Sequence, residues 1–126
     1  DYKLPNGYQI SRLSGDIIIL HTNRYIPVEG KPDELTNVMI NSRILSFSYN
    51  ERYIGIQWID PLEVGEKDIK TIEAQNVLYY LVDSEVDIKY GAFETEEEFN
   101  EFCRSKSIEN IFDWIKTSPA PKGATY

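Results

Sequence analysis

The 126-residue chain contains only one cysteine and one histidine. A single cysteine excludes an internal disulfide, and one of each is too few for a zinc site. His21 ends a predicted strand among polar residues, so we interpret it as structural. Cys103 shares a predicted apolar helix face with Phe99 and Phe102, which indicates a buried, inert thiol. The glycines are scattered and form no phosphate-binding loop. We therefore expect neither an enzyme nor a cofactor.

Long apolar runs and basic residues are also scarce. The longest aliphatic run, residues 17–20, has the length of a strand, whereas a membrane-spanning helix needs about 20 residues. Thirteen lysines and arginines face 21 acidic residues, which gives a net charge of −8. Such a balance does not suit a nucleic-acid binder, which needs a field that attracts phosphates. Because 41% of the residues are hydrophobic, the chain can still form one folded domain.

Three pairs of segments rich in strand-forming residues predict three β-hairpins. Their strands are expected at residues 8–13 and 16–22, at 45–49 and 54–58, and at 77–83 and 86–90. The turns between them are Ser14-Gly15, Asn50-Glu51 and Ser84-Glu85. Residues 26–37 contain two prolines and a glycine, and are predicted to be a long loop or an irregular edge segment. Residues 62–76 are polar and are predicted to be a second long connection.

Two helices are predicted after the strands. Thr95 and Glu98 have the spacing of a capping box, in which each side chain binds a free backbone N–H at the helix start. A second helix is predicted to begin at Ser107, because apolar residues follow at helical spacing: Ile108, Ile111, Phe112 and Ile115.

This order of elements predicts an α+β fold. We expect an antiparallel meander of about six strands, with two C-terminal helices on one face or end. Residues 1–116 are expected to form this single domain, and residues 117–126 a loose tail.

Acidic residues concentrate in residues 83–113, where ten acids and three bases give −7 of the total charge. One interpretation is a solvated helix face, because acids favour the first turn of a helix. The other is a docking surface for a basic protein partner. Its candidate binding residues are Glu96, Glu97 and Glu101, together with Trp114, which lies off the apolar helix face.

Asp83, Glu85 and Asp87 alternate in the manner of a calcium-binding loop. The sixth position of such a loop is normally glycine, but Ile88 stands there, in a predicted strand. These three acids are therefore only weak metal candidates, and we expect no metal site.

Several short motifs resemble small bacterial lipoprotein-like proteins of unknown function. The motifs are residues 79–83, the step Tyr90-Gly91-Ala92-Phe93 and the helix opening at residues 95–99. Residues 4–8 also look like the start of such mature chains, shortly after an acylated cysteine. The resemblance covers about a third of the chain. It implies export and a lipid anchor preceding Asp1, and it carries over no catalytic residues.

Three functions follow as hypotheses. The first is a non-enzymatic, extracytoplasmic binding domain that contacts the membrane only through the missing anchor and binds a ligand or protein of the cell envelope. The second is a cytoplasmic, immunity-type inhibitor whose acidic surface covers a basic toxin. The third is a small hydrolase with a pocket that holds His21 or a carboxylate of perturbed pKa.

Overall fold

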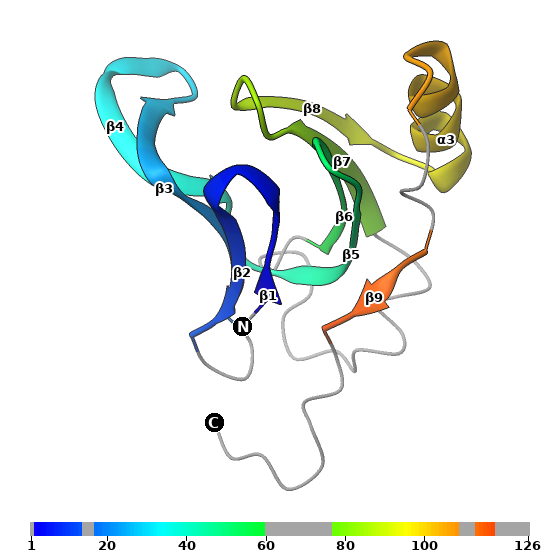
Figure 1. The fold of residues 1–126 in the computed structure, drawn as a ribbon, viewed down its shortest axis with the longest axis horizontal. Helices are drawn as coiled ribbons and strands as arrows, with labels where there is room; N and C mark the ends of the chain where they lie inside the picture. The colour runs from blue at the N-terminus through cyan, green and yellow to red at the C-terminus, as the bar shows by residue number, and fades with distance from the viewer. Residues whose placement is uncertain (1, 14–16, 60–76, 109–112, 118–126) are drawn as a thin grey trace, which may run out of the picture.

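A computed structural model describes residues 2–13, 17–59, 77–108 and 113–117. In these ranges the protein is mainly β: two antiparallel sheets of four and five strands are accompanied by a single short helix (Figure 1). The expected α+β meander with two helices is therefore only partly correct. Its strands are antiparallel, but they divide into two sheets.

The first sheet has the strand order β1-β2-β3-β4. Its strands are β1 (Tyr2–Lys3), β2 (Tyr8–Arg12), β3 (Ile18–Val28) and β4 (Lys31–Ile40), and the short 3-10 helix η1 (Pro5–Gly7) precedes β2. The ladder between β2 and β3 runs from Tyr8 opposite Thr22 to Arg12 opposite Ile18. This ladder confirms the first predicted hairpin, whose turn lies outside the described residues.

The second sheet has the strand order β8-β7-β6-β5-β9. Its strands are β5 (Ile44–Tyr49), β6 (Tyr53–Ile59), β7 (Val77–Asp83), β8 (Ile88–Phe93) and β9 (Ile115–Lys116). The second and third predicted hairpins are thus confirmed, although the third turn spans residues 84–87. The predicted connection at residues 62–76 lies outside the described residues.

The loop predicted at residues 26–37 is instead a β-hairpin formed by the distal parts of β3 and β4. We call residues 23–37 the arm. The prolines are tolerated because both positions lie at sheet edges, where a missing N–H removes no ladder bond. β4 is an edge strand, and the pairing of β3 with β2 ends at Thr22, well before Pro27.

The helix is α3 (Glu96–Ser105), and its predicted start is correct. The Thr95 hydroxyl accepts a hydrogen bond from the Glu98 N–H at 3.1 Å. The Glu98 carboxylate accepts from the N–H of Glu94 at 3.3 Å, so the reciprocal half of the predicted capping box is displaced by one residue. Phe99 and Cys103 are fully buried, as the apolar face predicts.

The second predicted helix is wrong at both of its described ends. Ser107, expected to begin it, has a φ of 56° and instead terminates α3. Its N–H binds the carbonyl of Arg104 at 3.0 Å, and the next N–H, of Ile108, binds that of Cys103 at 2.9 Å; this is a Schellman motif. Ile115 belongs to β9 and pairs with Phe47. Residues 109–112 lie outside the described part of the chain.

The described residues contain three hydrophobic clusters, of which the smallest joins Leu45, Ile59 and Val77. The other two are the cores that separate three layers. The larger core lies between the two sheets and includes Tyr8, Leu20, Phe47 and Ile56. The smaller core joins the outer face of the second sheet to α3 through Leu81, Phe99, Cys103 and Ile108. The middle sheet is thus covered on both faces, which explains why even Ser46 and Ser48 are buried in β5.

Thr117, the first residue of the predicted tail, is held in place by the second sheet. Thr117 is buried, its N–H donates to the carbonyl of Leu45 at 2.9 Å, and its hydroxyl donates to that of Ile44 at 2.8 Å. These bonds fix Thr117 beside β5. Residues 118–126, the remainder of the predicted tail, lie outside the described residues.

Replacing Phe99 with alanine should lower the free energy of unfolding by about 3–5 kcal/mol, because a fully buried aromatic side chain leaves a cavity. Phe102→Ala, at a partly buried position on the same helix, should have a smaller effect. Urea unfolding of both variants tests this expectation, and equal losses would contradict it.

Candidate binding site

A groove separates the arm from the turn between β7 and β8. Its volume is about 800 Å³, within the range of ligand-binding sites. Figure 1 shows the arm curving away from the rest of the molecule on the side of the β7–β8 hairpin. The groove is lined by Ile26, Thr36, Val38 and Met39 on one side and by Val86 and Lys89 on the other.

An irregularity in β3 produces the bend of the arm. His21 pairs with Val38, whereas the next recorded pair joins Ile26 to Thr36. Four residues of β3 therefore stand opposite one residue of β4. Such a bulge bends a strand and redirects its side chains. The inserted segment includes Arg24, which reaches toward the second sheet.

Arg24 ties the arm to the β7–β8 turn through Asp87. Its Nη2 donates to Asp87 Oδ1 at 2.6 Å, and its Nε donates to Oδ2 at 3.1 Å. The hydroxyl of Tyr8, on β2, donates to the same Oδ1 at 2.7 Å. The hydrogen bond from Arg24 lowers the pKa of Asp87. The pKa of Tyr8 is raised, mainly because the side chain is buried and secondly because its hydroxyl binds Asp87. One carboxylate thus joins two strands of the first sheet to the second.

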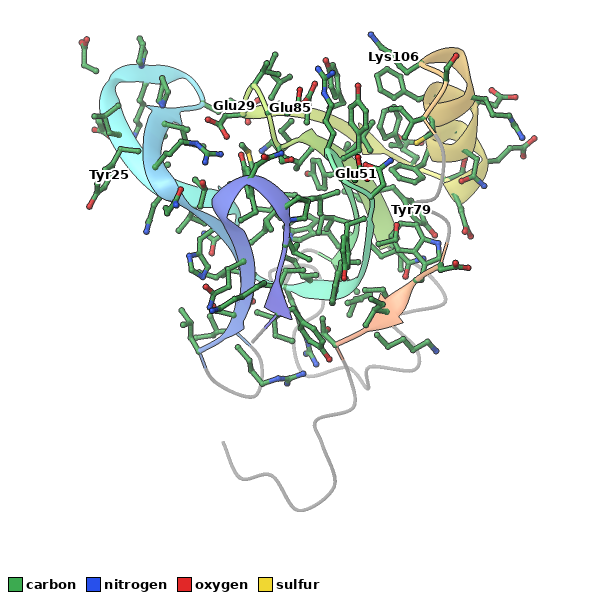
Figure 2. The ribbon with its side chains drawn as sticks, viewed as in Figure 1. Tyr25, Glu29, Glu51, Tyr79, Glu85 and Lys106 are labelled. Atoms are coloured by element: carbon green, nitrogen blue, oxygen red, sulfur yellow. The ribbon has the colours of Figure 1, made fainter. Side chains whose placement is uncertain are left out.

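A second ion pair crosses the groove. Lys89 Nζ, on β8, lies 3.3 Å from the carboxylate of Glu29, which directly follows β3 at the tip of the arm. The same ammonium group lies 5.4 Å from the centre of the Tyr80 ring. Figure 2 shows Glu29 on the part of the arm that faces the β7–β8 turn, and Tyr25 on the arm itself. The charged residues Asp87 and Lys89 that line the groove are therefore paired within the protein.

The three weak metal candidates bind arginines. Arg52 donates to both carboxylate oxygens of Asp83, at 2.9 and 2.7 Å, and lies 3.4 Å from the carboxylate of Glu85. The hydrogen bond from Arg52 lowers the pKa of Asp83. Asp87 forms its ion pair with Arg24. Among the described residues, no group of three histidine, cysteine or acidic side chains is arranged to hold a metal ion.

The candidate residues of the acidic segment lie on α3 and beside it, away from the groove lining. Trp114 donates to the carboxylate of Glu96 at 3.1 Å, and its ring lies 5.6 Å from that of Phe99. Trp114 therefore packs against the smaller core. Glu97 and Glu101 are exposed. The docking of a basic partner on this surface stays a prediction.

His21 and Cys103 also lie outside the groove lining. His21 Nε2 is 2.7 Å from the hydroxyl of Ser11, to which Gln9 also donates at 3.2 Å. Ser11 is itself only 6% exposed, on β2. Burial raises the pKa of the Cys103 thiol to about 11, which fits the predicted inert cysteine.

The groove could not be identified from the sequence pattern. The prolines at 27 and 32 and the glycine at 30 gave the arm the composition of a loop. One signal was present: residues 35–40 contain no charge, proline or glycine and favour a strand.

Comparison of the chain with protein-family models, curated proteins and solved structures finds no match. Among the described residues, no helix has the length and apolar character needed to cross a membrane.

Asp87→Asn should destabilise the protein by about 1–3 kcal/mol at neutral pH, because it removes a charged hydrogen-bond acceptor shared by Arg24 and Tyr8. The pKa of Asp87 is lower in the folded protein than in the unfolded chain, where it is about 4. The ionised carboxylate therefore stabilises the folded state above about pH 4, and this contribution is lost as the pH falls through the pKa of the folded state. The difference between wild type and variant should therefore shrink toward about pH 3 in urea unfolding.

The exposed Glu97→Gln serves as the control and should leave stability nearly unchanged at both pH values. A difference between wild type and Asp87→Asn that stays constant with pH would contradict the assigned role of the Asp87 carboxylate.

Proposed function

We propose that this protein is a non-enzymatic binding domain of the bacterial cell envelope, and that its groove holds an extended polypeptide segment of a partner. The observation that carries the proposal is the groove itself, which is open and is lined by β3 and β4 of the arm on one side and by the β7–β8 turn and β8 on the other.

The lining of the groove supports a polypeptide ligand. Ile26, Val38, Met39 and Val86 supply apolar contacts, and Thr36 supplies a hydroxyl. The charges of Asp87 and Lys89 are already compensated by Arg24 and Glu29. An uncharged, mainly apolar segment can therefore bind without separating a pair, whereas a strongly charged small molecule would compete with both pairs.

A binding role also agrees with the placement of the chemically reactive groups. The hydroxyl of Ser11 and the imidazole of His21 contact each other outside the groove lining. The thiol of Cys103 is buried in the smaller core. We therefore favour binding over the small-hydrolase hypothesis.

The location at the envelope rests on the motifs that resemble bacterial lipoprotein-like proteins. Fractionation of native cells and the intact mass of the full-length protein test it. We expect the protein in the membrane fraction with the mass of a diacylglyceryl-modified cysteine. An unmodified protein in the cytoplasmic fraction would contradict the location and leave the binding proposal to be judged separately.

A matched pair of variants tests the groove. Val38 lines it, and the neighbouring Asn37 is exposed and does not line it. A random library of displayed peptides of about ten residues, a length typical of a long strand, is selected on the wild-type protein. Selected peptides should lose at least about tenfold in affinity for Val38→Arg, because a charge then occupies an apolar contact. Asn37→Arg should bind them as the wild type does.

Thermal unfolding of both variants checks that Val38→Arg remains folded. If no peptide is enriched, or if the two variants bind equally well, the groove is not a polypeptide site. A parallel titration with oligosaccharides that shifts the NMR signals of Val38 and Val86 would then identify the groove as a carbohydrate site.

A further inference from the structure

We infer that the partner segment enters as an added β-strand along residues Leu35 to Ile40 of β4, with its basic end beside the tip of the arm. This inference rests on the proposed function and specifies how the groove recognises its ligand.

The free edge of β4 is the first argument. β4 pairs with β3 on one side and ends the first sheet on the other, among the described strands. An edge strand presents unpaired N–H and C=O groups, and natural proteins protect such edges with proline and charged residues. The outer half of β4 has this protection in Pro32, Asp33 and Glu34.

The inner half of β4 lacks proline and charge, and among its described hydrogen bonds only the N–H of Val38 donates to a side chain, Thr36 Oγ1, at 3.1 Å. Residues 35–40 read Leu-Thr-Asn-Val-Met-Ile. The protected half lies toward the tip of the arm, and the uncharged half borders the groove through Thr36, Val38 and Met39. The change in composition along one strand therefore coincides with the start of the groove.

The side chains of β4 connect this edge to the groove. Thr36 and Val38, two residues apart, both line the groove, and the adjacent Met39 joins them because the register of β4 shifts on either side of Val38. A strand paired with β4 would place every second side chain beside them. The backbone of the partner would supply affinity, and β-branched or apolar side chains at alternate positions would fit the groove.

The opposite border of the groove is a less suitable edge. β8 also ends its sheet, but it carries Lys89, and a lysine on an edge strand protects it against pairing. Both edge strands have irregular pairing: the register of β8 with β7 shifts between Tyr79 and Leu81, and that of β4 shifts on either side of Val38. The preference for β4 therefore rests on the lack of charge in its inner half.

Charge at the tip of the arm determines the orientation of the partner. Glu29, Asp33 and Glu34 are exposed there, with Lys31 as the base between them. Glu29 also faces Lys89 across the groove. The acidic excess favours lysine or arginine at the end of the partner strand that lies nearest to the tip.

Backbone methylation of a selected peptide tests the added strand. Two versions are synthesised, one N-methylated on the odd residues and the other on the even residues. An added strand pairs along one of its edges only, so one version should lose at least about tenfold in affinity and the other should retain most of it. Slowed amide exchange at residues 35–40 in the complex should accompany binding.

Charge reversal tests the orientation with a matched control. Asp33→Lys combined with Glu34→Lys should weaken the selected peptides about fivefold or more, and added salt should diminish this difference. Glu97→Lys combined with Glu101→Lys makes the same change of charge on α3 and should have little effect. A loss of binding only in the α3 variant would overturn the inference and favour the acidic helix as the docking surface.

The outcomes separate the two proposals. Peptides that depend on Val38 but tolerate methylation on both edges would overturn the added strand and leave the groove as a polypeptide site. Peptides that lose affinity equally on both edges would also overturn it, because that pattern indicates a general steric effect. The absence of any enriched peptide would overturn both proposals.

Discussion

The hydrogen-bonded contact at Asp87 is the interaction on which the rest of the architecture depends. This carboxylate, at a turn of the second sheet, accepts hydrogen bonds from Tyr8 and from Arg24 of the first sheet. The bulge in β3 brings Arg24 into reach, and the same bulge bends the arm. A single arrangement therefore joins the sheets and sets the distance across which the groove opens.

The pairing of charges explains how a strongly acidic chain maintains a nearly neutral groove. The net charge is −8, yet the acids that face the groove each have a basic partner: Arg24 for Asp87 and Lys89 for Glu29. The exposed, acidic excess lies instead at the tip of the arm and on α3. Ion pairs of this kind contribute little stability when exposed, but they fix the positions of the strands that carry them. We interpret them as positioning contacts around an apolar site.

Local patterns in the sequence predicted the elements that depend on neighbours in the chain. The strand-forming residues at 77–83 and the cap at Thr95 specify a strand and a helix start without reference to the rest of the molecule. The arm was missed because Pro27 and Pro32 are compatible with a strand only at an edge, and edges are set by distant pairing. The second helix was predicted because Ile108 and Ile115 have helical spacing by coincidence.

The candidate site depended even more on distant contacts. Asp83 and Asp87 resembled cation ligands, but their arginine partners stand 31 and 63 residues away in the sequence. No local pattern reveals such partners. The division of the strands into two sheets, and hence the groove between them, follows from the same long-range contacts.

The short strand β9 has a consequence for how the central sheet could be extended. It occupies the side of β5 that would otherwise be the second open edge of the central sheet. At the other end of the first sheet, β1 offers an edge of only two residues, too short for a stable ladder. β8, with six residues, is the longer of the two edges of the central sheet among the described strands. Any further strand that extended the central sheet would therefore have to add beside β8.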